Sequence, residues 1–465
     1  MNLYALLQSR FPADRSAPCL ILPDGNDLNY GALKAGVGRL AALLVAKGVS
    51  PGDRVAAQTA KSPEAMMLYL ATLQVGAVFL PLNPAYTAAE VDYFLGDAEP
   101  ALFVTDAVAL AREADPLSPR SEIHDAAPGE LAALVYTSGT TGRAKGAMLS
   151  HHNLASNALA LQEAWGFTGD DVLLHALPIF HVHGLFVAIH CALLSGAPIL
   201  WLARFDEDAV LAALPRATVM MGVPTFYARL MADPRFTAEA VAHMRLFISG
   251  SAPLLESAFD AFEARTGFRI LERYGMSEAQ MITTNPLHGK RLAGSVGFPL
   301  PGVSVRIAGD EATGVVEIAG PSITAGYWRN AEKTAQAFTS DGFFVTGDIG
   351  RLDADGRLWL SGRANDLIIS GGLNVYPKEI ELVLDELPGV GESAVIGVDH
   401  PDFGEAVVAV IAGAGDETAI VAACRARLAA FKTPKRVVFV AELPRNAMGK
   451  VEKATLRQTY ADLFQ

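Results

Sequence analysis

The chain has 465 residues, of which 51% are hydrophobic and 19% are charged, so it is long enough for more than one domain and too apolar to be disordered. Its formal net charge of −13 argues against a general nucleic-acid-binding or anionic-membrane surface, so an anionic ligand would need a local basic site. Its three cysteines, Cys19, Cys191 and Cys424, have no C-x-x-C spacing, which argues against a zinc or disulfide framework and favours a reducing, cytoplasmic location.

The N-terminal residues lack a basic segment followed by a long apolar core, and no run of about 18 apolar residues occurs along the chain. We therefore expect neither a signal peptide nor a membrane span. The apolar stretch 186–194 is short and predicts a buried helix.

Residues 1–130 alternate helical stretches with short apolar strands. The alanine-rich stretch 30–47 ends at Gly48 and predicts a helix. A second helix is expected at 65–76, and strands are expected at 54–58, 78–82 and 102–105. This alternation predicts a parallel sheet with helices on its faces.

Residues 170–300 repeat that rhythm, with strands expected at 172–177, 198–202, 219–222, 246–249 and 270–274. After Gly302, short strands separated by turn residues predict a β-rich subdomain, with strands at 303–307, 314–318, 343–345, 350–352 and 358–361. Asp355-Gly356 is typical of a hairpin turn within it.

From about Asp366 the pattern predicts a compact module, with helices at 378–386 and 416–431 and strands at 390–398, 406–412 and 436–440. No long disordered linker precedes it, so the module should turn on a short hinge. The expected fold class is α/β, with a large N-terminal domain of helix-flanked mixed or parallel sheets, a β-rich subdomain, and a small mobile α+β C-terminal domain.

The stretch 136–146 has the composition of a loop that grips polyphosphate. It follows five apolar residues that predict a buried strand, and it contains Thr137, Ser138, Gly139, Thr140, Thr141, Gly142 and Lys145. Glycines expose backbone N–H groups, hydroxyls donate to anionic oxygens, and the lysine adds positive charge. The spacing is not that of Walker A, because only two residues separate Gly142 from Lys145 and Gly146 follows the lysine.

Residues 270–280 place polar side chains at the end of an expected strand, where ligands bind in open α/β sheets. Tyr274 could stack on a purine, Ser277 could donate to a phosphate, and Glu278 could hold Mg²⁺, which prefers carboxylate and phosphate oxygens. Taken alone, the same segment could also be an ordinary surface turn.

Other candidates are weaker when taken singly. Asp348 and Arg363 each follow an expected strand, and a carboxylate suits the ribose hydroxyls of a nucleotide. Lys450, which follows a glycine near the C-terminal end, is typical of a solvated surface lysine. His181 and His183 alternate as in a strand, and because no third ligand lies nearby we expect a pocket wall or core histidines rather than a metal site.

Taken together and in order, these pieces resemble the adenylate-forming superfamily of acyl-CoA synthetases, adenylation domains and luciferases. The matching segments cover nearly the whole chain: 136–146, 274–278, Gly347-Asp348, Gly362-Arg363 with Asp366, Gly371-Gly372 with 374–381, and Pro444-Arg445 with Gly449-Lys450. The resemblance implies an AMP-binding domain at 1–364, a mobile C-terminal domain at 366–465, and a hinge at Asn365.

The resemblance also implies the site residues. ATP and AMP would contact Thr137, Ser138, Gly139, Thr140, Thr141, Gly142, Lys145, Ser251, Tyr274, Gly275, Met276, Ser277, Asp348, Arg363 and Lys450. The catalytic residues would be Lys450, Lys145 and Glu278, and Glu278 would also hold Mg²⁺. Gly371 and Gly372 would face coenzyme A after the small domain rotates.

Within the superfamily, the segments 178–186, 222–230, 244–254 and 271–276 look like those of malonyl-CoA and methylmalonyl-CoA synthetases. The acid-binding residues that this implies are His183, Arg229, Ser251, Arg273 and Met276, with Arg229 and Arg273 on the distal carboxylate. The physical argument agrees, because a buried second carboxylate needs paired charge and arginine offers a bidentate fork. A fatty-acid ligase would line that wall with apolar side chains.

The expected function is an ATP-dependent CoA ligase that activates malonate or methylmalonate through an acyl-adenylate and releases AMP and pyrophosphate, using ATP, Mg²⁺ and coenzyme A. Three alternatives stay open: a CoA ligase for another short-chain or aromatic acid, an adenylation enzyme that loads a separate carrier protein, and a catalytically silent nucleotide-binding module. The expected partners are small molecules, with no nucleic acid, and the chain would act as a monomer or homodimer. Ala144, Ser277 and Ala279-Gln280 depart from the usual proline, threonine and Thr-Asn of the family pattern.

Overall fold

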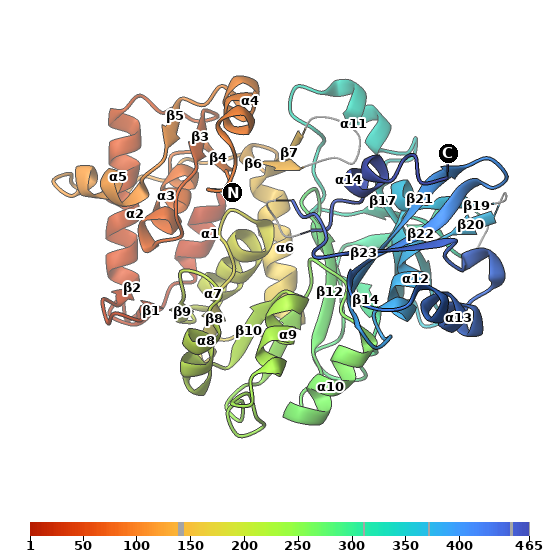
Figure 1. Ribbon diagram of the computed structural model, residues 1–465. Coiled ribbons are helices and arrows are strands. Elements are labelled where there is room, and N and C mark those ends of the chain that lie inside the picture. The colour runs from red at the N-terminus through yellow and green to blue at the C-terminus, as the bar shows by residue number, and fades with distance from the viewer. Residues whose placement is uncertain (138–143, 310–311, 371–372, 447–449, 465) are drawn as a thin grey trace. The chain divides into compact units, whose positions relative to one another are not determined.

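The computed structural model describes residues 1–137, 144–309, 312–370, 373–446 and 450–464 (Figure 1). The predicted loop residues Ser138, Gly139, Thr140, Thr141 and Gly142, and the predicted CoA-side residues Gly371 and Gly372, lie outside these ranges. The chain divides into two compact units. Unit 1 comprises Met1–Val305, Ile318–Phe344 and Gly356–Leu358, and unit 2 comprises Arg306–Glu317, Val345–Asp355 and Trp359–Gln465.

Unit 1 contains a five-stranded sheet in the order β5-β3-β4-β6-β7. Its strands are β3 (Arg54–Ala57), β4 (Val78–Pro81), β5 (Leu102–Val104), β6 (Leu131–Thr137) and β7 (Lys145–Ser150). The first four strands of that order pair in parallel, as the alternation of helices and strands predicts, and β7 returns antiparallel to β6. The predicted phosphate loop lies in the chain between the end of β6 and the start of β7.

The larger sheet of unit 1 has the order β14-β13-β12-β11-β10-β8-β9-β1-β2. Its strands are β1 (Pro18–Ile21), β2 (Leu28–Asn29), β8 (Leu173–His175), β9 (Ile199–Trp201), β10 (Val219–Gly222), β11 (Leu246–Ser249), β12 (Leu271–Met276), β13 (Gln280–Thr284) and β14 (Ser295–Pro299). The pairs from β1 through β9, β8, β10 and β11 to β12 are parallel, whereas β13 and β14 are antiparallel additions.

Successive side chains on each strand point to opposite faces of a sheet. In both sheets each face is apolar and is covered by helices. Val55 packs into a central core shared by the two sheets, whereas Ala56 packs with α4. In the larger sheet, Ile248 faces that central core and Phe247 faces a second core under α8, α9 and α10. The helices of unit 1 are α1 (Leu3–Ser9), α2 (Tyr30–Ala46), α3 (Pro63–Gln74), α4 (Ala88–Ala98), α5 (Ala107–Ala114), α6 (His151–Ala164), α7 (Ile189–Ser195), α8 (Glu207–Ala213), α9 (Pro224–Ala232), α10 (Glu256–Thr266) and α11 (Ala331–Ala337).

Unit 2 holds most of the predicted β-rich subdomain, with β15 (Ser304–Ile307), β16 (Gly314–Ala319), β17 (Phe344–Leu352) and β18 (Leu358–Arg363) as neighbours in that order. It also contains a separate five-stranded sheet made of β19 (Ile368–Ser370), β20 (Leu373–Val375), β21 (Val390–His400), β22 (Gly404–Gly413) and β23 (Arg436–Val440). The helices α12 (Pro377–Leu384) and α13 (Glu417–Arg427) pack on one face of that sheet, and α14 (Lys453–Thr459) packs on the other (Figure 1).

The mixed α/β class and the order of elements confirm the fold expected from the sequence. Two details were wrong. The separate strands expected at 343–345 and 350–352 are one strand, β17. The strand-like alternation of His181 and His183 is not a strand: His183 begins the π-helical turn η1 (His183–Ala188), which continues into α7. No helix in the described ranges is long and apolar enough to cross a membrane.

Candidate functional site

Glu278 is the centre of one polar cluster in unit 1. It lies in the turn between β12 and β13, and it is 7% exposed. Its Oε1 accepts from the hydroxyl of Thr137 and from the phenol of Tyr327, both at 3.2 Å. Thr137 is the last residue of β6 and directly precedes the predicted phosphate loop. The tight turn between β12 and β13 therefore places the Glu278 carboxylate beside the start of that loop.

Lys145 reaches the same cluster from the other side of that loop. It opens β7, opposite Thr137 in the β6–β7 pair, and its Nζ lies 5.2 Å from the ring centroid of Tyr327. Burial raises the pKa of Tyr327, and the adjacent Glu278 adds to the effect, so this phenol stays neutral. A neutral phenol can donate to the carboxylate while its ring faces the ammonium group.

A second cluster joins three predicted acid-site residues. Ser251 follows β11 with φ of +70°, His183 opens the π-helical turn, and Arg273 lies on β12. The Ser251 hydroxyl is 3.4 Å from Nδ1 of His183 and also 3.4 Å from Nη2 of Arg273. The three side chains come from separate elements, so the tertiary fold brings them together.

Arg273 is a buried cation whose hydrogen bonds are incomplete. It is 3% exposed, and its Nε has no hydrogen-bond partner among the described residues. Burial lowers the pKa of its guanidinium to about 9, an effect that nearby Tyr227 partly opposes. Burial also lowers the pKa of His183 well below 6.5, and Arg273 adds to that shift, so His183 is neutral beside the guanidinium.

Gly250 makes the position of that guanidinium possible. A Cβ added at Gly250 would lie 2.5 Å from Cζ of Arg273, closer than non-bonded atoms can approach. The absence of a side chain at residue 250 therefore leaves the space that the arginine head group occupies. Gly250 is a site residue that sequence reasoning missed, although it lies in the segment 244–254.

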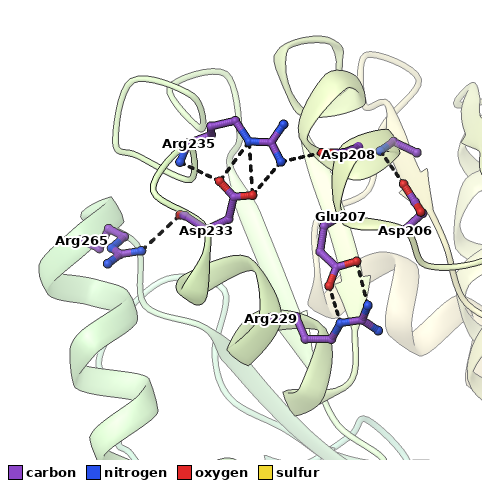
Figure 2. Close-up of polar contacts among 8 residues, drawn as sticks. Asp206, Glu207, Asp208, Arg229, Asp233, Arg235 and Arg265 are labelled. Atoms are coloured by element: carbon purple, nitrogen blue, oxygen red, sulfur yellow. Dashed lines mark hydrogen bonds and ion pairs between the residues drawn. The ribbon is translucent and has the colours of Figure 1, made fainter.

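Arg229 makes different contacts from Arg273. It projects from α9 with 57% of its side chain exposed, forms a bidentate pair with Glu207 of α8, and lies over the ring of Phe205. Figure 2 shows this pair beside a neighbouring surface group in which Arg235 contacts Asp208 and Asp233. The described contacts of Arg229 thus involve Glu207 and Phe205, and its predicted role on the acid's second carboxylate stays a prediction.

The remaining nucleotide residues of unit 1 lie along the same hairpin. Tyr274, Gly275 and Met276 complete β12, and Ser277 begins the turn before Glu278. A Cβ at Gly275 would lie 2.0 Å from the carbonyl oxygen of Gln280, so only glycine allows this close strand pairing.

Unit 2 carries a separate set of predicted nucleotide residues. Asp348 lies within β17 and is 5% exposed, and its Oδ1 is 2.7 Å from Nε of Arg363 at the end of β18. The preceding Gly347 has φ of +72°, a conformation that favours glycine. The strand pair therefore presents a buried carboxylate next to a partly exposed guanidinium.

The predicted hinge and catalytic lysine also belong to unit 2. Asn365 lies in a short 3₁₀ turn, Ala364–Asp366, and Asp366 pairs with Arg457 of α14 at 2.9 Å. Lys450 is exposed, and its backbone N–H donates to Oδ1 of Asn446 at 3.1 Å. The hinge at Asn365 and the domain boundary beside it stay predictions.

Tyr327 is the residue in the first cluster that the sequence reasoning missed. It lies in the run Thr324-Ala-Gly-Tyr-Trp328, and the Thr324 backbone N–H donates to the carbonyl of Glu278 at 2.7 Å. The available signal was a glycine followed directly by two aromatic residues and preceded two positions earlier by a threonine. Within the described ranges no group of three or more His, Cys, Asp or Glu side chains could hold a metal ion.

Comparison with known proteins gives the family directly. The AMP-binding enzyme family model matches residues 8–328, and the AMP-binding enzyme C-terminal domain model matches residues 379–450. The crystal structure of ATP-bound MatB from Rhodopseudomonas palustris is 48% identical, with a TM-score of 0.96, and covers 100% of this chain and 99% of that chain.

Two curated enzymes are also similar. The sulfoacetate–CoA ligase of Cupriavidus necator is 35% identical over 98% of this chain and 97% of its own length. The mitochondrial malonate–CoA ligase ACSF3 of Mus musculus is 35% identical over 83% of this chain and 78% of its own length. The resemblance drawn from the ordered motifs is thereby confirmed, and the chain belongs to the AMP-binding enzyme family of adenylate-forming enzymes.

Proposed function

We propose that this chain is an ATP-dependent malonate–CoA ligase, an acid–thiol ligase that forms malonyl-AMP and then malonyl-CoA. The observation that carries the proposal is the buried guanidinium of Arg273, which touches Ser251 and retains an unpaired Nε. A buried, incompletely paired cation is costly unless an anion meets it. Malonate keeps a second carboxylate while the first one reacts, and that carboxylate would complete the pair.

The malonate–CoA ligase of Mus musculus supports the choice of acid. In the proposed pose, the distal carboxylate accepts from Arg273 and from the hydroxyl of Ser251. Neutral His183 lines the same wall, and its Nδ1–H would donate to the Ser251 oxygen while the Ser251 hydroxyl donates to the carboxylate. We also assign Met276 to this wall, and we assign Arg229 to the same carboxylate on condition that it leaves Glu207.

On the nucleotide side, the first half-reaction joins the reacting carboxylate to the α-phosphorus of ATP and releases pyrophosphate. We assign the β- and γ-phosphates to Thr137, to the loop 138–142 and to Lys145, and the ribose to Asp348 and Arg363. Tyr274 to Ser277 are assigned to the adenosine and the α-phosphate. The first of these assignments is supported by the contacts of Glu278 with Thr137 and Tyr327 and by the position of Lys145 over the Tyr327 ring.

The donor set around Glu278 fits Mg²⁺. A single carboxylate with a neighbouring hydroxyl is typical of Mg²⁺ sites in which substrate phosphates and water supply the other oxygens. When bound, the ion would neutralise charge on the leaving pyrophosphate. The carboxylate of Glu278 would hold it at the phosphate edge, where Tyr327 restrains that carboxylate by hydrogen bonding.

Lys450 is assigned to the first half-reaction, in which its ammonium group would stabilise the negative charge that develops on the α-phosphate. Rotation at Asn365 would then replace Lys450 with the segment containing Gly371 and Gly372, beside which the thiol of coenzyme A attacks the acyl-adenylate. This follows the general pattern of a lid motion that separates two chemical steps. We further propose a cytoplasmic monomer or homodimer.

Sulfoacetate is the second candidate acid, and the Cupriavidus necator relative favours it. Its sulfonate is also an anion two bonds from the reacting carboxylate, so Arg273 would suit it as well. Methylmalonate differs from malonate by one methyl group, a difference worth only about 1–3 kcal/mol in an apolar pocket.

The test is thioester formation by the purified full chain with ATP, Mg²⁺ and coenzyme A, using malonate, methylmalonate, sulfoacetate, propionate and benzoate in parallel. We expect malonyl-CoA, AMP and pyrophosphate in equal amounts, with malonate giving the highest kcat/KM. In a reaction without coenzyme A, malonate should release pyrophosphate only to about the enzyme concentration. A higher kcat/KM for propionate or benzoate would overturn the dicarboxylate assignment. A higher kcat/KM for sulfoacetate would show that sulfoacetate, not malonate, is the substrate.

A further inference from the structure

Lys61 is a half-buried lysine in a polar arrangement away from the clusters described above. It follows β3 and directly precedes Ser62, the N-cap of α3. Its Nζ is 2.7 Å from Nδ1 of His175 and 2.9 Å from the carbonyl oxygen of the same residue, and it lies 4.5 Å from the ring centroid of Trp201. Within the described part of the chain, no carboxylate forms an ion pair with this amine.

The orientation of His175 follows from its second contact. Its Nε2 lies 2.9 Å from the carbonyl oxygen of Gly184, which can only accept, so Nε2 carries the proton. Nδ1 therefore presents a lone pair to Lys61. The imidazole is 1% exposed and stacks on Trp201 with centroids 5.2 Å apart, which fixes its plane. An amine, an adjacent base and a group that orients the base form the arrangement of an activated nucleophile.

Burial acts on both groups in a consistent direction. It lowers the pKa of Lys61 well below 10.5, since the ammonium ion loses hydration without gaining a carboxylate. Burial and then the nearby Lys61 lower the pKa of His175 well below 6.5. The neutral forms of both side chains are thus favoured, and a neutral amine is the nucleophilic form of lysine.

A cavity gives access to this amine from solvent. It has a volume of about 310 Å³ and is lined by Lys61, Trp201, Pro63 and Asp24 among others. The carboxylate of Asp24, the acidic group in this lining, is exposed and bonded to Asn26, with Oδ2 2.9 Å from Nδ2. A small electrophile can therefore enter without displacing an ion pair from Lys61.

We propose that Lys61 is an acylation site, at which its amine accepts the acyl group of an activated carboxylic acid such as an acyl thioester. Nζ attacks the thioester carbonyl carbon and forms a C–N bond. The C–S bond breaks with its electron pair on sulfur, and the proton lost from Nζ passes to Nδ1 of His175 and then to the thiolate. The products are an amide on Lys61 and free thiol. The proposed ligase function supplies the thioester in the cell, and the inference rests on it for the donor alone.

The chemistry of the product agrees with the site. The amide is uncharged at any pH, so acylated Lys61 can no longer gain the proton whose charge this poorly hydrated site disfavours. The amide retains one N–H, whereas the amine donates toward both Nδ1 and the carbonyl oxygen of His175. The modified protein therefore loses one of these two hydrogen bonds. The remaining amide N–H can still donate to Nδ1 of His175.

The experiment incubates the wild-type full chain with purified malonyl-CoA at pH 7.5, without ATP or malonate, and measures acylation of individual lysines by peptide mass spectrometry over time. Supplying the thioester separates this test from the proposed ligase function, whose failure would not affect it. We expect Lys61 to react at least about tenfold faster than Lys34, an exposed lysine of α2, because each unit of lowered pKa raises the free-amine fraction tenfold. Equal or slower reaction at Lys61 would overturn the proposal.

A variant tests the role of the base. His175→Asn shortens the side chain and removes the imidazole base, and we expect Lys61 to fall to within about twofold of Lys34 in a variant whose circular dichroism matches the wild type. Continued fast acylation would exclude His175 as the proton acceptor. If that variant does not fold, the wild-type comparison of the two lysines still decides the main claim. Free malonate without activation should leave Lys61 unmodified.

Discussion

Replacing Arg273 with methionine tests the acid-binding assignment most directly. Methionine fills much of the same volume without charge, so the packing of β12 is largely retained. Each charge-assisted hydrogen bond to the distal carboxylate contributes about 1.5–3 kcal/mol, which corresponds to a loss of about 10- to 150-fold in kcat/KM for malonate. Propionate has no distal carboxylate, so its kcat/KM should change little or rise.

The same variant should also be more stable than the wild type in the absence of substrate. Arg273 is 3% exposed, and burial lowers the pKa of its guanidinium to about 9, so the charge is poorly compensated in the free protein. Removing a buried, poorly paired charge can stabilise a fold by on the order of 1–4 kcal/mol. Loss of malonate activity together with a raised midpoint of urea unfolding distinguishes loss of substrate recognition from general damage.

The assay is steady-state thioester formation with malonate and with propionate, accompanied by urea unfolding of each protein. Arg269→Met is the matched control, since Arg269 is an exposed arginine paired with Glu263. Arg229→Met tests the role of the second predicted arginine. A selective loss of kcat/KM for malonate would support the assignment that Arg229 leaves Glu207 and binds the distal carboxylate. An unchanged kcat/KM would exclude Arg229 from the acid site. An unchanged malonate-to-propionate ratio in Arg273→Met would refute the whole account of selectivity.

Three further predictions follow from individual contacts. Lys450→Ala should lower malonate-dependent pyrophosphate release by at least about 10²–10³-fold but leave thioester formation from supplied malonyl-AMP nearly intact, and equal loss of both steps would contradict its assignment. Gly250→Ala should raise KM for malonate at least about tenfold, because the new Cβ would lie 2.5 Å from Cζ of Arg273, whereas Gly96→Ala, with nothing within 4 Å, is the control. Glu272→Gln should flatten the pH dependence of stability, because burial raises the pKa of Glu272 from 4.5 to about 8. Between those pH values the folded chain keeps a proton that the unfolded chain has lost, so the free energy of unfolding of the wild type falls as pH rises. Urea unfolding of both proteins at pH 5 and pH 8 measures this. An equal decrease in the free energy of unfolding for wild type and variant would contradict the prediction.

Local sequence patterns were sufficient to predict most elements of the fold. The strand expected at 219–222 is β10, Val219–Gly222, and the helix expected at 30–47 is α2, Tyr30–Ala46. Both follow from features that act over a few residues: apolar runs bounded by polar residues, and an alanine-rich stretch that ends at a glycine.

The same local reasoning failed where one sequence pattern is compatible with both a strand and a helical turn. The alternation of His181 and His183 fits a strand, but tertiary packing makes His183 the start of a π-helical turn. A Cβ at Gly184 would lie 2.0 Å from the carbonyl oxygen of Pro178, so this turn depends on a close backbone approach to another segment. Spacing within the chain carries no information about such an approach.

The order of motifs along the chain determined the family, the α/β fold class and the set of residue types available for chemistry at a phosphate and a carboxylate. Only the tertiary structure decided how those residues are paired. It placed Tyr327 between Lys145 and Glu278, buried Arg273 against Gly250 and Ser251, and bound Arg229 to Glu207. The physical reason is that burial and pairing set the charge state and cost of each group, and both depend on atoms contributed by elements far apart in the sequence.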